Sequence, residues 1–230
     1  MLRHIRLLVF DLDYVVFDSA ALKITALRQS LVCLADAIPH SAKLPDAADA
    51  EESFRDYGYR WVEHLDLGLP EPASPLAEAY RIHERRLIEA GAGRIYPALV
   101  PLLSDWRTAD IELALGADAT RDYLLDVSDR HKLDDTFGIA LCSEEFGMGS
   151  VDEMLEEIMR LAQVNRSETI VLGTRPEYLR AARDLDLVTI ACGWGLQNRE
   201  SVAVADFRAL APAEVQPAIL RTDERAMRYH

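Results

Sequence analysis

The segment LLVFDLDYVVFDS, residues 7–19, constrains the fold more than any other part of the chain. A continuous apolar run, Leu7 to Phe10, leads directly into Asp11, and a second acid follows at Asp13. Such a run is typical of a strand covered on both faces, as in a parallel sheet. Buried carboxylates are costly, but open α/β sheets bind their ligands at the carboxyl ends of their strands. Asp11 and Asp13 are therefore candidate functional residues; the alternative is that they end the strand in a solvated turn.

Composition narrows the class of protein. The chain has 230 residues, of which 50% are hydrophobic and 28% charged, so we expect one large domain or one domain with an insertion. A net charge of −14 disfavours nucleic acid and anionic membranes as partners. No apolar run approaches a membrane span, and a strand so close to the first residue leaves no room for a secretory signal. Cys33, Cys142 and Cys192 lack metal-ligand spacing. We expect a cytoplasmic protein.

The next part of the chain has a helical pattern throughout. Apolar residues recur at helical spacing after Ser19, and Asp18 or Ser19 is placed to cap this first helix, which ends by Pro39. Further helices are predicted over residues 50–67 and 75–90. Strand patterns are absent between Ser19 and Ile95, so residues 19–94 are predicted to form an all-helical insertion.

From Ile95 onward, helical patterns alternate with short apolar runs. This alternation predicts βαβ units and a parallel sheet, which the first strand completes. The domains predicted are thus a core of residues 1–18 and 95–230 and a helical insertion of residues 19–94. The tail from residue 221 is predicted to be frayed. The helices predicted in the core are 96–109, 118–132, 151–163, 176–186 and 212–220, and the later strands are 111–115, 139–142, 169–172, 188–192 and 202–204.

The D-x-D after the first strand, followed at once by a helical insertion, resembles the haloacid dehalogenase (HAD) superfamily. Within it, the chain is most similar to the phosphoglycolate phosphatase and β-phosphoglucomutase group. The resemblance also covers IYPALVPLLSDWRTADIELAL, LDDTFGIALCSEEFG and ETIVLGTRPEYLRAARDLDLVTIACGWG, around the second, third, and fourth and fifth core strands. It implies an α/β fold: a Rossmann-like parallel-sheet core with an α-helical cap inserted after the first strand.

The resemblance implies roles for the two acids. In active members the first acid is a nucleophile that attacks phosphorus, and the second is a general acid/base; Asp11 and Asp13 occupy these positions. The family also supplies a Ser or Thr after the second strand, a Lys before the third helix, and one or two Asp that complete a Mg²⁺ site. This sequence departs from the pattern at each of these, with Gly116 at the hydroxyl, Met148 at the lysine, and Thr174 and Tyr178 at the acid positions.

Further residues bear on this site. Tyr14 and Val15 replace the usual Gly-Thr and place bulk near a phosphate. Asp118 and Glu177 could be recruited to the site as acids. Both are better interpreted as acids at helix N-termini, where the helix dipole stabilises a negative charge.

Arg175 could supply the missing cation or could face solvent. A site with few carboxylates holds Mg²⁺ weakly, and Asp11 and Asp13 without a metal are a like-charged pair, so the pKa of one should be raised.

Two functions remain open. We favour a pseudo-phosphatase with little turnover that binds a small phosphorylated ligand or a protein partner and needs no cofactor, because removing several charge-stabilising groups leaves little catalysis. The alternative is an active phosphate-monoester hydrolase, with Asp11 as nucleophile, Asp13 as acid/base and Mg²⁺ as cofactor. By family resemblance alone, the chain would be a hydrolase.

Overall fold

The chain folds into two compact units, as seen in a computed structural model that describes residues 4–34, 47–64, 74–147, 150–195 and 199–226. The core unit is Met1–Asp18 with Ile95–His230, and the helical unit is Ser19–Arg94. None of the helices in these ranges is long and apolar enough to cross a membrane.

The core unit is built on a six-stranded sheet of order β5-β4-β1-β6-β7-β8, in which every pairing is parallel. All four residues of β1 are fully buried, as the apolar run predicts. Phe10 pairs with Leu115 of β4 on one side and with Leu172 of β6 on the other, so β1 is central. The predicted α/β class is confirmed. The strands are β1 Leu7–Phe10, β4 Glu112–Ala117, β5 Ile139–Cys142, β6 Thr169–Gly173, β7 Val188–Cys192 and β8 Phe207–Ala209.

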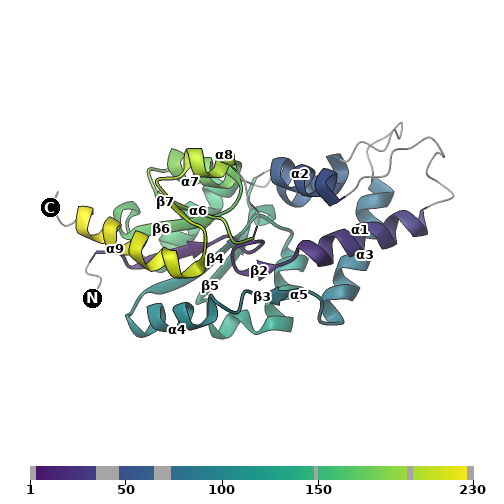
Figure 1. Cartoon of the computed structure of the whole chain (residues 1–230). Coiled ribbons are helices and arrows are strands. Elements are labelled where there is room, and N and C mark those ends of the chain that lie inside the picture. The colour runs from purple at the N-terminus through teal and green to yellow at the C-terminus, as the bar shows by residue number, and fades with distance from the viewer. Residues whose placement is uncertain (1–3, 35–46, 65–73, 148–149, 196–198, 227–230) are drawn as a thin grey trace. The chain divides into compact units, whose positions relative to one another are not determined.

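Helices cover both faces of this sheet (Figure 1). Successive side chains of a strand point to opposite faces, so Val9 and Phe10 mark the two sides. Val9 packs into an apolar cluster with α6 and α7, whereas Phe10 lies 5.8 Å, between ring centroids, from Trp106 of α4. The indole of Trp106 in turn donates to Gln216 of α9. The helices are α4 Val100–Thr108, α5 Arg121–His131, α6 Val151–Ala162, α7 Pro176–Asp184, α8 Arg199–Val204 and α9 Val215–Ala226.

The helical unit contains α1 Ala20–Cys33, α2 Ala47–Tyr57, the 3₁₀ helix η1 Gly58–His64 and α3 Ser74–Glu89. Its interior holds a charged pair, with Lys23 Nζ 3.5 Å from Glu84 Oε1. Tyr80 donates to the same carboxylate oxygen at 2.5 Å, and the Lys23 ammonium lies 4.9 Å from the centre of the Phe54 ring. A buried pair of this kind is stable only because neighbouring groups complete its contacts.

Two predictions near the C-terminus are wrong. Residues 202–204 are not a strand but the end of α8, and the last strand is β8, three residues later. A short run of valine and alanine fits either periodicity, so the sequence could not decide. The tail is not frayed from residue 221, because α9 continues to Ala226. The carboxylate of Asp223 accepts hydrogen bonds from the backbone N–H groups of His4, at 2.7 Å, and Ile5, at 3.0 Å, which fixes the helix to the start of the chain.

Several helix ends also differ from prediction. The helix predicted over 50–67 changes to 3₁₀ geometry at Gly58, which adopts a positive φ of 56°. The helix predicted from residue 96 begins at Val100. Of the two predicted cap residues, Ser19 occupies the N-cap position of α1, but its side chain makes no capping hydrogen bond. Two short strands, β2 Phe17–Asp18 and β3 Arg94–Ile95, had no sequence signal and pair where the chain leaves and re-enters the core unit.

Candidate active site

Asp11 and Asp13 lie together just beyond the carboxyl end of β1. Both are buried, with 2% and 5% of their surface exposed, so the alternative of a solvated turn is wrong. The Asp11 N–H donates to the carbonyl of Leu172 at 2.9 Å, which continues the pairing of β1 with β6. The Asp13 carboxylate accepts a hydrogen bond from the Tyr123 hydroxyl of α5 at 2.7 Å. The fold therefore holds both acids in fixed positions at the ligand-binding edge of the sheet.

Arg175, between β6 and α7, is the cation of this site. Its side chain is only 3% exposed, so the solvent-facing alternative is wrong. The guanidinium forms an ion pair with Asp118, and its Nε lies 4.0 Å from Oδ2 of Asp11. Asp118 also accepts a hydrogen bond from the Ser143 hydroxyl at 2.6 Å. The ends of β1, β4, β5 and β6 thus contribute side chains to one buried, charged cluster.

The interpretation of Asp118 as a helix N-terminal acid is wrong. The helix α5 begins three residues later, at Arg121, and its N-cap is Thr120, whose hydroxyl accepts from the Tyr123 N–H at 3.3 Å. Glu177, by contrast, does lie in the first turn of α7, where its side chain pairs with Arg180 at 2.7 Å.

Protonation of the cluster follows from its burial. Burial raises the pKa of Asp11 to about 8, which the Arg175 charge opposes and the charges of Asp13 and Asp118 reinforce. The predicted rise in the pKa of one of the paired acids is confirmed, although desolvation rather than the neighbouring acid is its main cause. Burial disfavours the charged form of Arg175, but Asp118 and Asp11 outweigh it and raise the Arg175 pKa. At pH 7 the site therefore holds a neutral Asp11 beside a permanent cation.

Gly116 and Tyr178 are in direct contact. The Tyr178 side chain is fully buried, and its hydroxyl donates to the Gly116 carbonyl at 2.5 Å. A Cβ at position 116 would lie 2.7 Å from that hydroxyl oxygen and 3.1 Å from Cδ1 of Ile158. Burial, followed by the charge of Asp11, raises the Tyr178 pKa well above its usual value, so the phenol stays a neutral donor. Gly116 and Tyr178, which both depart from the family pattern, therefore pack against each other as a single contact.

The other two departures differ in what the structure shows. Thr174 is buried, and within the described ranges its hydroxyl has no hydrogen-bond partner, although its carbonyl accepts from the Ser201 hydroxyl at 2.5 Å. Met148, at the lysine position, lies outside the described residues.

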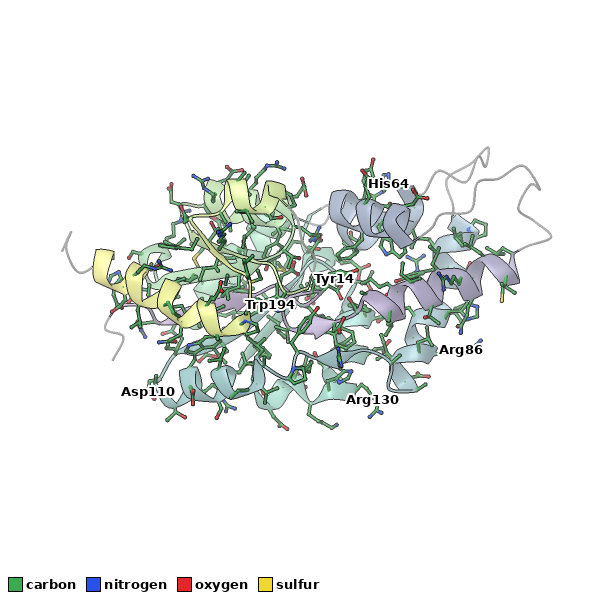
Figure 2. The ribbon with its side chains drawn as sticks, viewed as in Figure 1. Tyr14, His64, Arg86, Asp110, Arg130 and Trp194 are labelled. Carbon is green, nitrogen blue, oxygen red and sulfur yellow. The ribbon has the colours of Figure 1, made fainter. Side chains whose placement is uncertain are left out.

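The turn after Asp13 is held by the segment that follows β7, which the sequence reasoning did not identify. Tyr14 is buried and has a positive φ of 64°, an uncommon conformation for a residue with a side chain. The Trp194 indole donates to the Val15 carbonyl at 3.0 Å, and Figure 2 shows Tyr14 and Trp194 close to one another. A Cβ at Gly195 would lie 2.1 Å from the Tyr14 carbonyl oxygen, so only glycine allows this approach.

The residues present do not fit a Mg²⁺ site. Magnesium demands near-ideal octahedral oxygen coordination, usually through one or two carboxylates together with water and phosphate. Here Asp118 is paired with Arg175, whose charge also lies close to Asp11 and opposes a second cation. In the described parts of the chain, no three Asp, Glu, His or Cys side chains are grouped so that they could hold a metal ion.

The sheet order, the D-x-D after β1 and the helical segment that follows it make up an α/β fold that is similar to solved structures of HAD-like proteins. Solved structures with this fold include CbbY from Rhodobacter sphaeroides in complex with phosphate, with a TM-score of 0.75 and 18% identity over 92% of this chain and 96% of that one. A predicted phosphoglycolate phosphatase from Haemophilus somnus has a TM-score of 0.79 and 11% identity over 95% and 99%. A HAD-like family hydrolase from Streptococcus pneumoniae has a TM-score of 0.74 and 17% identity over 94% and 98%.

The expected resemblance in fold is confirmed by these structures. No family model matches the sequence, and no curated protein matches it. Identities this low establish the fold of the chain and leave its activity to the chemistry of the site.

Proposed function

We propose that this chain is a pseudo-phosphatase: a HAD-fold protein that binds a small phosphorylated ligand or a protein partner with little turnover. The observation that carries the proposal is the buried contact of Arg175 with Asp118 and Asp11. Asp118 neutralises the Arg175 charge inside the site, where a phosphatase needs a free charge to stabilise a transferring phosphoryl group.

Two physical reasons support low turnover. A carboxylic acid attacks phosphorus only as its carboxylate, and a pKa of about 8 leaves Asp11 mostly protonated at pH 7. The second reason is that the Arg175 charge is already balanced by Asp118, and moving it onto a phosphate would leave a half-buried carboxylate without its partner.

The test is a panel of phosphate monoesters, including phosphoglycolate, sugar phosphates and p-nitrophenyl phosphate, with millimolar Mg²⁺. We expect no hydrolysis above the rate of the Asp11→Asn variant, which keeps the size of the side chain but cannot act as a nucleophile. Turnover by the wild type that disappears in Asp11→Asn would refute the pseudo-phosphatase proposal.

One observation favours a second candidate, a phosphate-monoester hydrolase with Asp11 as nucleophile and Asp13 as general acid/base. Both acids lie at the carboxyl end of β1, where the fold binds ligands. This candidate predicts activity that rises as pH passes about 8, because Asp11 ionises there. Repeating the panel below and above that pH therefore distinguishes the two functions.

A further inference from the structure

A cavity of about 520 Å³ lies in the core unit, between α4, the end of α5 and the segment that enters β5. Its volume is within the range of small-molecule sites. Its floor is apolar and consists of the buried side chains of Leu103, Leu133 and Phe137. Its rim is polar, with the hydroxyl groups of Ser104 and Thr136. A ligand with an apolar body and one polar end would fit such a cavity.

Among the residues that the structure describes, the cavity is lined by a positive charge and no negative one, although the chain as a whole is acidic. Of the described residues that line it, Arg107 is the one with a permanent charge, and none is an acid. The nearby carboxylates, such as Asp110 and Asp134, line a second cavity of about 460 Å³ that shares Arg107. Arg107 is exposed and donates from Nη1 to the backbone carbonyl of Asp135 at 2.7 Å, which orients the guanidinium and leaves further N–H donors for a ligand.

His131 forms part of the wall. Its ring lies 5.0 Å, between centroids, from the ring of Phe17. Burial, followed by the charge of Arg130, lowers the pKa of His131, so the imidazole is neutral at pH 7. Its Nε2 is buried and has no hydrogen-bond partner within the described ranges, an arrangement that a bound polar group or water would relieve.

We propose that this cavity binds a small carboxylate with an apolar body, with the carboxylate on Arg107 and the body against Leu103, Leu133 and Phe137. A planar guanidinium pairs with a carboxylate through two parallel hydrogen bonds, which favours a flat, singly charged group. The other lining side chains are neutral, so the cavity offers no compensation for a second negative charge. The inference is independent of the proposed function, because Asp11 and Arg175 do not line this cavity.

The test is a titration of the full chain with phenylpropionate, followed by heteronuclear NMR. We expect saturable shifts of backbone amides around the cavity, and binding of phenylpropionamide, which has the same shape without the charge, weaker by about tenfold or more. Arg107→Gln should weaken binding of the acid by a similar factor and remove the difference between acid and amide. Arg160→Gln removes an exposed arginine of α6 that pairs with Glu157, and should leave the affinity unchanged.

Absence of saturable shifts, or equal affinity for the acid and the amide, would overturn the proposal. So would shifts centred on Asp11 and Arg175, because the ligand would then occupy the candidate active site. Asp11→Asn is therefore included, and unchanged binding of phenylpropionate to it is the expected result. The inference fails if phenylpropionate does not bind at the cavity. The proposed function fails if the wild type hydrolyses a phosphate monoester and Asp11→Asn does not. The two failures are therefore distinguishable.

Discussion

Replacing Asp11 with asparagine should stabilise the folded chain at pH 7 and remove part of its pH dependence. The folded-state pKa of Asp11 is about 8, against an ordinary value of 3.8, so the folded chain keeps a proton that the unfolded chain releases. At pH values below 3.8, Asp11 is protonated in both the folded and the unfolded chain, and it does not lower the free energy of unfolding. As pH rises from there to about 8, stability falls, and above that it levels off. Asparagine mimics the neutral acid and never ionises in the unfolded chain.

The structure sets the size of this effect. Each unit of pKa difference corresponds to about 1.4 kcal/mol, and at pH 7 the relevant span runs from 3.8 to 7. The upper limit of the stabilisation is therefore about 4 kcal/mol at pH 7, and roughly half of that is a reasonable expectation after local relaxation. Asp11 is neutral at this pH, so the ion pair between Arg175 and Asp118 should survive the change.

The assay is urea unfolding of the wild type and Asp11→Asn at a series of pH values between the ordinary and the folded-state pKa of Asp11. The difference in unfolding free energy should grow steadily with pH across this window. Asp129→Asn is the matched control, because Asp129 is an exposed acid of α5. A variant less stable than the wild type at pH 7, or a difference that stays constant with pH, would show that Asp11 is ionised in the folded chain.

Three other substitutions test the contacts around the site. Arg175→Met should lower the free energy of unfolding by about 3–5 kcal/mol, measured by urea denaturation, because it leaves Asp118 without its partner; a change near zero would contradict the buried pair. Gly116→Thr should cost about 1–3 kcal/mol because of the contact with Tyr178, and Tyr178→Ala should suppress part of that cost in a double-mutant cycle, whereas additive effects would argue against the contact. Gly195→Ala should lower the thermal midpoint and change the fluorescence of the neighbouring Trp194, while an unchanged midpoint would mean that the Tyr14 turn lies elsewhere.

The sequence was most informative about the central strands. β1, β6 and β7 are short apolar runs bounded by polar residues, a pattern that follows directly from burial on both faces. It was least informative at the β8 edge of the sheet, where the strand has only three residues, of which Arg208 is exposed. A strand this short, at an edge that is covered on fewer sides, carries a weaker hydrophobic pattern than a central strand.

The candidate site divides in the same way. Asp11 and Asp13 could be predicted because they directly follow β1 in the sequence, and an acid pair after an apolar strand is a pattern of neighbouring residues. The partner of Arg175 was missed because Asp118 is 57 residues away, and the hydroxyl of Tyr178 reaches Gly116 across 62 residues. Nothing in either local pattern encodes such pairings, which arise only when the parallel strands place their carboxyl ends side by side.

These two long-range pairs bear on why the chain departs from the phosphatase pattern at several positions together. Tyr178 fills the space that a side chain at Gly116 would need, so a hydroxyl-bearing residue at 116 would fit better if the tyrosine were also replaced. Arg175 and Asp118 are likewise stable only as a pair, since either one alone would be an uncompensated charge in a buried site. A hydroxyl-bearing side chain at position 116 would therefore disturb the first pair, and loss of either member of the second pair would cost stability. Both pairs favour the present, internally paired form of the site, which is the form that the pseudo-phosphatase proposal requires.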